Sequence, residues 1–151
     1  MNTFAARRSS DRVRCSNAPF ATGSLGDALL APTRIYVKPL LALLGDFDVH
    51  GLAHVTGGGI TDNLPRVLPP GTAARVNRTA WRVPTLFRWL GESGRVPEYD
   101  LRRSLNMGIG MILVVAASDV DAVRQGLLNA GEANSVVIGD IIKGEPEVQY
   151  V

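Results

Sequence analysis

A short apolar run followed directly by an amphipathic segment places the strongest constraint on this fold. Residues 107–117, MGIGMILVVAA, are apolar, β-branched and short, which is typical of a central strand. Residues 118–131, SDVDAVRQGLLNAG, follow at once with the spacing of a helix. We expect Ser118 to cap this helix and Gly131 to end it. A strand joined to a helix in this way predicts a sheet covered by helices.

The same alternation of short apolar runs and amphipathic segments continues along the chain. Strands are expected at 49–56, 73–77 and 135–143, and helices at 60–68, 83–94 and 96–105. Pro65 should limit the regularity of the first of these helices. The order of elements predicts an α/β (α+β) fold with a mixed sheet and packed helices.

The segment before the first strand contains two prolines that bear on where a helix begins. Pro32 suits a first helical turn, and Pro39 should then bend or interrupt the helix. The apolar side of this helix would consist of Ile35, Leu40, Leu41 and Leu44.

Composition excludes several classes of protein. The length of 151 residues is that of one domain. Cys15 is the only cysteine, so neither an intramolecular disulfide nor a cysteine zinc cluster can form. The longest apolar run, Met111–Ala117, is far too short to span a membrane, so no membrane partner is expected.

The positive charge of the chain is concentrated at its start. Residues 1–23 carry four arginines against one aspartate, whereas the remaining residues carry 12 basic and 13 acidic side chains. Without a basic stripe on the body, nucleic acid is not an expected partner. Residues 1–23 also lack any apolar period, which predicts a tail that is disordered or unrelated to the body. Their Arg- and Ser-rich composition leaves an organelle transit peptide as an alternative.

Three consecutive glycines follow the strand expected at 49–56, in the stretch HVTGGGITDNLPRV. Bare backbone between a strand and a helix can admit a phosphate, because no Cβ atom blocks its approach to the N–H groups. The candidate phosphate-binding residues are Thr56, Gly57, Gly58, Gly59 and Asn63. The spacing matches neither GxGxxG nor the P-loop, so a tight structural turn is the alternative.

A second glycine pair lies in NMGIGM, residues 106–111, within a pattern expected to be a strand. Glycine there indicates either close approach by a backbone or ligand, or a bulge. His50 and His54 lie four apart on an expected strand with no carboxylate to complete a ligand set, so no metal site is expected. No Ser/His/Asp arrangement appears, and no catalytic residue can be named.

Several stretches, taken together, resemble the C-terminal domain of the phosphoribosylformylglycinamidine cyclo-ligase family, also called aminoimidazole ribonucleotide (AIR) synthetases. They are LLAPTRIYVKP (29–39), HGLAHVTGGGITDNLPRVLP (50–69) and NMGIGM (106–111), in that order. VPTLFRWLGESGRV and AGEANSVVIGDII are also similar to the family. The resemblance covers about residues 24–143, and residues 24–151 are expected to form the domain.

The resemblance implies a fold with a ferredoxin-like core and added helices. It implies ATP-dependent ring closure of formylglycinamidine ribonucleotide in purine synthesis, with ATP and Mg²⁺ as cofactors, a homodimer, and a cytoplasmic location. Thr56 to Gly59 and Asn63 fall on a family motif that lines the substrate cleft. Asn106, Gly108 and Gly110 fall on a second such motif.

The family's ATP-binding N-terminal half has no counterpart in residues 1–23. The Asp-Gly-Val-Gly-Thr-Lys stretch, the acidic metal-binding positions and the Gly-Pro-His-Ser-Asn-Gly loop are all missing there. We therefore expect the chain to be inactive alone. It could be a gene fragment, an alternative product, or a subunit that needs the other half in trans. One alternative is a non-catalytic fragment that binds a partner chain or a phosphorylated ligand. Another is a sister enzyme such as thiamine monophosphate kinase or selenophosphate synthetase.

Overall fold

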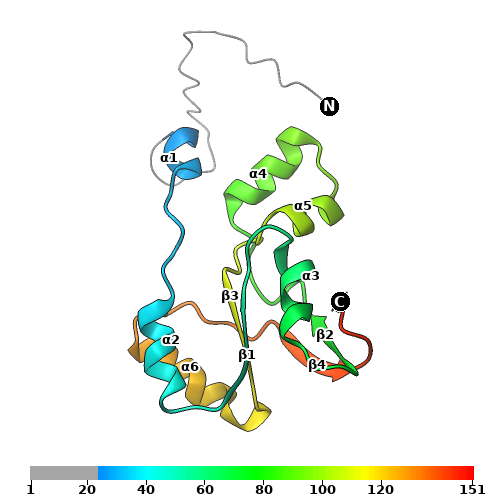
Figure 1. The fold of residues 1–151 in the computed structure, drawn as a ribbon. Coiled ribbons are helices and arrows are strands. Elements are labelled where there is room, and N and C mark those ends of the chain that lie inside the picture. Colours follow the sequence, from blue (N-terminus) through cyan, green and yellow to red (C-terminus); the bar gives the residue numbers. More distant parts are fainter. Residues whose placement is uncertain (1–23) are drawn as a thin grey trace. The chain divides into compact units, whose positions relative to one another are not determined.

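A computed structural model describes residues 24–151 (Figure 1). The predictions made for residues 1–23 lie outside this range. The chain divides into two compact units, the first ending at Pro32 and the second running from Thr33 to Val151. The described part of the first unit holds α1 (Leu25–Leu29). Ser24 caps this helix, because its Oγ accepts from the Asp27 N–H while the Asp27 carboxylate accepts from the Ser24 N–H.

The second unit contains helices and strands in the alternating order expected. The helices are α2 (Val37–Leu44), α3 (Gly59–Asn63), α4 (Thr85–Gly94), α5 (Glu98–Ser104) and α6 (Val120–Asn129), with 3₁₀ turns at η1 (Leu64–Val67) and η2 (Ala117–Asp119). The strands are β1 (Val49–His54), β2 (Thr72–Val76), β3 (Met111–Val115), β4 (Gly139–Lys143) and β5 (Val148–Tyr150). The expected α+β class is confirmed. No helix among residues 24–151 is long and apolar enough to cross a membrane.

The strands form two sheets within the described part of the chain. β1 and β3 pair antiparallel, with Leu52 opposite Leu113. β2 lies at the centre of the other sheet, antiparallel to β4 and parallel to β5. The mixed sheet that the sequence predicts is thus confirmed in the order β4-β2-β5. The division into two sheets and the strand β5 were not predicted.

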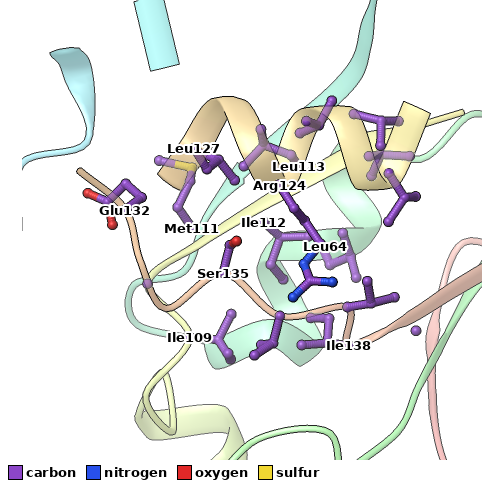
Figure 2. A pocket seen from close by; sticks show the side chains of 18 of the residues that line it. Leu64, Ile109, Met111, Ile112, Leu113, Arg124, Leu127, Glu132, Ser135 and Ile138 are labelled. Carbon is purple, nitrogen blue, oxygen red and sulfur yellow. The ribbon is translucent and has the colours of Figure 1, made fainter. Parts of the chain in front are cut away.

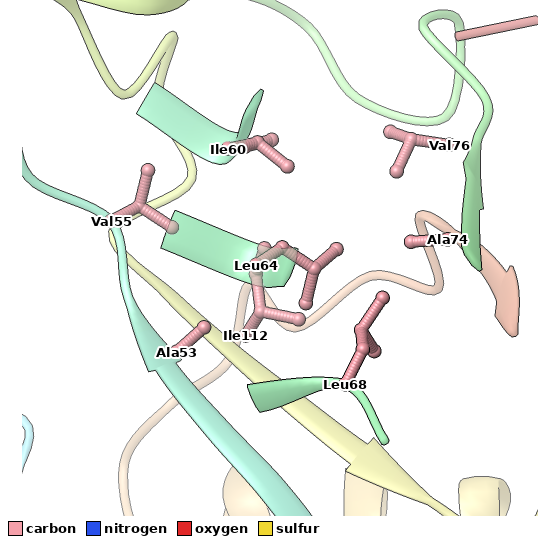
Figure 3. Close-up of a cluster of buried hydrophobic side chains, with 8 residues drawn as sticks. All are labelled: Ala53, Val55, Ile60, Leu64, Leu68, Ala74, Val76 and Ile112. Atoms are coloured by element: carbon pink, nitrogen blue, oxygen red, sulfur yellow. The ribbon is translucent and has the colours of Figure 1, made fainter. Parts of the chain in front are cut away.

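The hydrophobic core joins the two sheets through α3 and η1. Figure 3 shows Ile60 and Leu64 between β1 and β3 on one side and β2 on the other. The core residues are Ala53, Val55, Ile60, Leu64, Leu68, Ala74, Val76 and Ile112. Full burial of a valine, leucine or isoleucine side chain contributes about 1.5–3 kcal/mol to stability. The segment that follows β1 is therefore fixed in place by the core on both of its sides.

The prediction of a helix starting at Pro32 was wrong. α2 begins at Val37, and Pro39 lies in its first turn, where a missing N–H costs nothing. The buried residues of α2 are Pro39 and Leu43, whereas Ile35 and Leu41 are exposed. Leu43 packs on Gly126 of α6, where a Cβ atom would lie 2.7 Å from its Cδ2, and α2 and α6 lie side by side in Figure 1.

A helix was correctly predicted after β3, but its first residue was not. Ser118 does not cap it, because residues 117–119 form the turn η2 and the Ser118 hydroxyl donates instead to Asp119 Oδ1 at 2.8 Å. Gly131 follows the helix with a φ of 90°, which confirms its expected place at the helix end. β3 and β4 begin four residues later than expected, at Met111 and Gly139.

Candidate functional site

The two glycine-rich stretches meet at one end of the β1–β3 ladder. β1 leads into residues 55–59, and residues 106–110 lead into β3. Because the strands are antiparallel, with His54 opposite Met111, both loops leave the ladder at the same end. The Val55 N–H donates to the Gly110 carbonyl oxygen at 2.9 Å. The fold therefore joins two stretches that lie far apart in the sequence.

Gly58 and Gly59 have conformations and surroundings that no other residue could adopt without strain. Their φ angles are 98° and 60°, in the left-handed region. A Cβ atom on Gly58 would lie 2.8 Å from the Asp62 Cβ. One on Gly59 would lie 1.8 Å from the Arg102 carbonyl oxygen, because the last turn of α5 packs on this buried glycine. These two glycines are required by the loop itself.

Asn63 holds the loop from inside. Its side chain is buried, and its Nδ2 donates to the carbonyl oxygens of Gly57 at 3.1 Å and Gly59 at 2.8 Å. Its Oδ1 accepts from Arg66 Nη1 at 3.3 Å. Both amide hydrogens are thus used within the loop, so Asn63 positions the backbone around it.

Thr56 and Gly57 form the open part of this loop. Both are exposed, and a Cβ atom on Gly57 would meet no other atom within 4 Å. No hydrogen bond from the Gly57 or Gly58 N–H is found among the described residues. Of the three glycines, Gly57 is the one whose bare backbone has no explanation in the packing of the fold.

Residues 106–110 form a turn before β3. The sequence pattern had indicated a strand here, and that prediction was wrong. Asn106 Oδ1 accepts from the Gly108 N–H at 2.9 Å, and Gly108 has a φ of 98°. Met107, which is buried, also has a positive φ, of 52°, and its carbonyl oxygen accepts from Trp81 Nε1 at 2.9 Å. This indole bond anchors the turn.

Side chains, and not backbone, approach the two glycines of this turn. A Cβ atom on Gly108 would lie 2.5 Å from the Pro84 Cδ, and one on Gly110 would lie 2.0 Å from the Tyr36 hydroxyl oxygen. The Tyr36 ring also meets the His54 ring edge-on, with centroids 6.1 Å apart. Tyr36 was not recognised as a site residue, although it lies in the 29–39 stretch that carries part of the resemblance.

Arginines of α5 border the glycine loop. Arg103 Nη2 pairs with Asp62 at 3.1 Å. Tyr99, and after it Asp62, raise the pKa of Arg103 by accepting its hydrogen bonds. Hydrogen bonds from Arg102 lower the pKa of Glu98. The Arg102 guanidinium lies 5.0 Å from the Tyr150 ring centroid, and its Nη1 is buried without a hydrogen-bond partner.

The histidines do not form part of a metal centre in the described range. His50 Nε2 lies 3.4 Å from Asp48 Oδ2, and His54 contacts Tyr36. Residues 24–151 contain no group of three or more His, Cys, Asp or Glu side chains that could hold a metal ion.

Comparisons with known proteins agree with the resemblance seen in the sequence. The family described as "AIR synthase related protein, C-terminal domain" matches residues 1–151. A protein of Neisseria gonorrhoeae named phosphoribosylformylglycinamidine cyclo-ligase is 50% identical over 117 residues, which are 77% of this chain and 34% of the relative. A protein of the same name from Neisseria meningitidis serogroup B is 51% identical over 122 residues, 80% of this chain and 35% of the relative. The chain thus spans about a third of the length of these relatives. It belongs to the family of AIR synthase related protein C-terminal domains.

Proposed function

We propose that residues 24–151 form the C-terminal domain of a phosphoribosylformylglycinamidine cyclo-ligase and line one wall of its substrate cleft. The observation that carries the proposal is the meeting of the two glycine-rich stretches at one end of the β1–β3 ladder. The 50–51% identity to relatives of that name supports the same activity.

The proposed reaction is the ATP-dependent closure of an imidazole ring. The γ-phosphoryl group of ATP is transferred to the formyl oxygen of formylglycinamidine ribonucleotide. A nitrogen of the same substrate then attacks the activated carbon, a C–N bond forms, and phosphate leaves. We assign the binding of ATP and Mg²⁺ to protein outside these 151 residues, since phosphoryl transfer depends on charge neutralisation around the phosphates.

Within this chain we assign the ligand contacts to the open polar groups of the two loops. They are the Thr56 hydroxyl, the N–H groups of Gly57 and Gly58, and the Asn106 side-chain amide. Gly59, Asn63 and Gly108 position these groups through the contacts described above. The substrate's 5′-phosphate or a phosphate of ATP is the group that exposed N–H and hydroxyl donors would suit.

We also propose that the domain associates with a second chain, either as part of a homodimer or with the remaining portion of the enzyme in trans. The exposed apolar side chains of α2 support this, because Val37, Leu41 and Leu44 are 58%, 65% and 45% exposed and recur along one helix. We assign the enzyme to the cytoplasm, by analogy with relatives named for a metabolic activity.

The decisive experiment reconstitutes the enzyme. Ring closure is measured for this chain alone, for the remaining portion of a relative alone, for the two mixed, and for a hybrid in which residues 24–151 replace the relative's C-terminal third. We expect product only from the mixture or the hybrid. A folded hybrid that makes no product, beside an active intact relative, would overturn the proposal. If this chain binds the remaining portion of the relative but the mixture makes no product, a non-catalytic, partner-binding fragment is favoured instead.

A further inference from the structure

A cavity of about 340 Å³ runs along β3 on the side that faces α6. Its walls are β3, α6 and the segment that leads into β4, and η1 contributes Leu64 (Figure 2). The lining is largely aliphatic, with Leu64, Ile109, Ile112, Leu113, Leu127 and Ile138 among its members. One end reaches the turn at Gly108 and Gly110, but Thr56 and Gly57 do not line it. The volume is at the lower end of the range for sites that hold small organic molecules.

The charged residues of the cavity do not balance. Arg34 Nη2 pairs with Glu132 at 2.9 Å, and Arg75 Nη2 pairs with Asp140 at 2.8 Å. Arg124 lines the same cavity, and its guanidinium makes no ion pair or hydrogen bond with any described residue. Figure 2 shows its guanidinium reaching from α6 toward Leu64 and Ile138. The cavity is therefore apolar with one uncompensated positive charge.

We propose that this cavity binds a small organic anion, in which an apolar body of one or two rings carries a single oxyanion group that pairs with Arg124. A guanidinium presents parallel N–H groups that match carboxylate and phosphate oxygens in pairs. Charge complementarity selects the anion, and the aliphatic walls select the apolar body. This site is separate from the proposed contacts at Thr56 and Gly57, and it stands whether or not the chain takes part in ring closure.

Two dyes of similar shape test the proposal with the full 151-residue chain. The anionic probe is 8-anilinonaphthalene-1-sulfonate, and the neutral probe is N-phenyl-1-naphthylamine, which lacks the sulfonate. Affinities are measured by fluorescence titration, and backbone amide NMR shifts locate the bound dye. We expect saturable binding of the anionic dye, with shifts confined to residues 109–115, 123–127 and 134–139.

Substitution of Arg124 separates charge recognition from simple apolar binding. Arg124→Met should weaken the anionic dye about tenfold or more and leave the neutral dye unchanged. Arg88→Met is the matched control, because Arg88 is an exposed arginine of α4 that does not line the cavity. Since Arg124 is exposed and unpaired, its replacement should not unfold the chain.

A second variant blocks the cavity itself. Ser135 lies in its wall, and Ser135→Trp should abolish binding of both dyes. Equal affinity of the anionic dye for the wild type and for Arg124→Met would overturn the proposal. So would shifts that lie outside the cavity or binding that does not saturate. The Arg124 comparison decides the matter even if Ser135→Trp fails to fold.

Discussion

The Gly59 backbone lies against the Arg102 carbonyl oxygen so closely that a Cβ atom on Gly59 would fall 1.8 Å from it. Gly59→Ala should therefore force α5 away from the loop, and it also places alanine at a φ of 60°. We expect the free energy of unfolding to fall by more than about 2 kcal/mol. Urea denaturation followed by circular dichroism measures this change.

Gly57→Ala is the matched control, two residues away in the same loop. Its Cβ atom would meet nothing within 4 Å, so the free energy of unfolding should change by less than about 0.5 kcal/mol. Equal losses in the two variants would show that the contact with Arg102 does not set the loop geometry.

Gly57→Val is the substitution that tests ligand contact. Gly58 is unsuitable, because its φ of 98° and the nearby Asp62 Cβ would strain any replacement. In the active hybrid, Gly57→Val should weaken binding of the substrate by at least about tenfold, with its melting temperature unchanged. Unaltered affinity would mean that the open backbone at Gly57 does not face the ligand.

Asn63→Ala removes the two hydrogen bonds to Gly57 and Gly59 from a buried position. Because both carbonyl oxygens then lose a partner, stability should fall by about 1–3 kcal/mol. Asn129→Ala is the control, since Asn129 is exposed and only accepts from Gln125 on the same helix. Hydrogen exchange should also become faster in the Asn63 variant alone at Gly59 and Asp62, whose N–H groups donate to the carbonyl oxygens of Thr56 and Gly58.

Glu98→Gln tests the pH dependence of the contact with Arg102. The folded-state pKa of Glu98 lies below its usual value of 4.5, because Arg102 donates to its ionised form. The stabilisation is therefore fully present above pH 4.5 and is lost as the pH falls through the folded-state pKa. At pH 7 the variant should be less stable by under about 1 kcal/mol, since Glu98 is largely exposed.

The difference between wild type and Glu98→Gln should shrink as the pH falls below 4.5. Unfolding curves at pH 7, 5 and 3.5 provide the comparison. A difference that stays constant over this range would assign the effect to packing and not to charge.

Local patterns in the sequence predicted most elements of the fold. The β-branched run ending at Val115 formed β3, and the helical spacing after it formed α6, which packs on α2. Pro32 and Pro39 were assigned the wrong roles, because either proline suits the first turn of a helix and the local sequence does not distinguish them. β5 escaped notice because three residues in a polar stretch carry no period, and their pairing with β2 is tertiary.

The sequence identified the loop of the candidate site but could not assign its glycines. Gly57, Gly58 and Gly59 are the same residue type and differ only in their tertiary contacts. Gly59 packs against α5, Gly58 lies close to Asp62, and Gly57 has no neighbour within 4 Å of a Cβ position. Likewise, the sequence suggested Asn63 as a ligand donor. In the fold Asn63 is buried, and its amide donates to the loop backbone instead. The cavity beside Arg124 has no local signature at all, because its walls come from separate segments.

The mixed sheet has a consequence for the order in which the chain can fold. Its central strand, β2, pairs on both edges with strands that follow it much later in the sequence, and Arg75 and Asp140 across one edge are 65 residues apart. Closing such long loops costs entropy before any pairing offsets it, so folding should be slow for a chain of this size. Until β4 and β5 arrive, both edges of β2 remain open to strands of other chains. Newly made protein should thus be prone to aggregation after β2 is made and before β4 and β5 are complete.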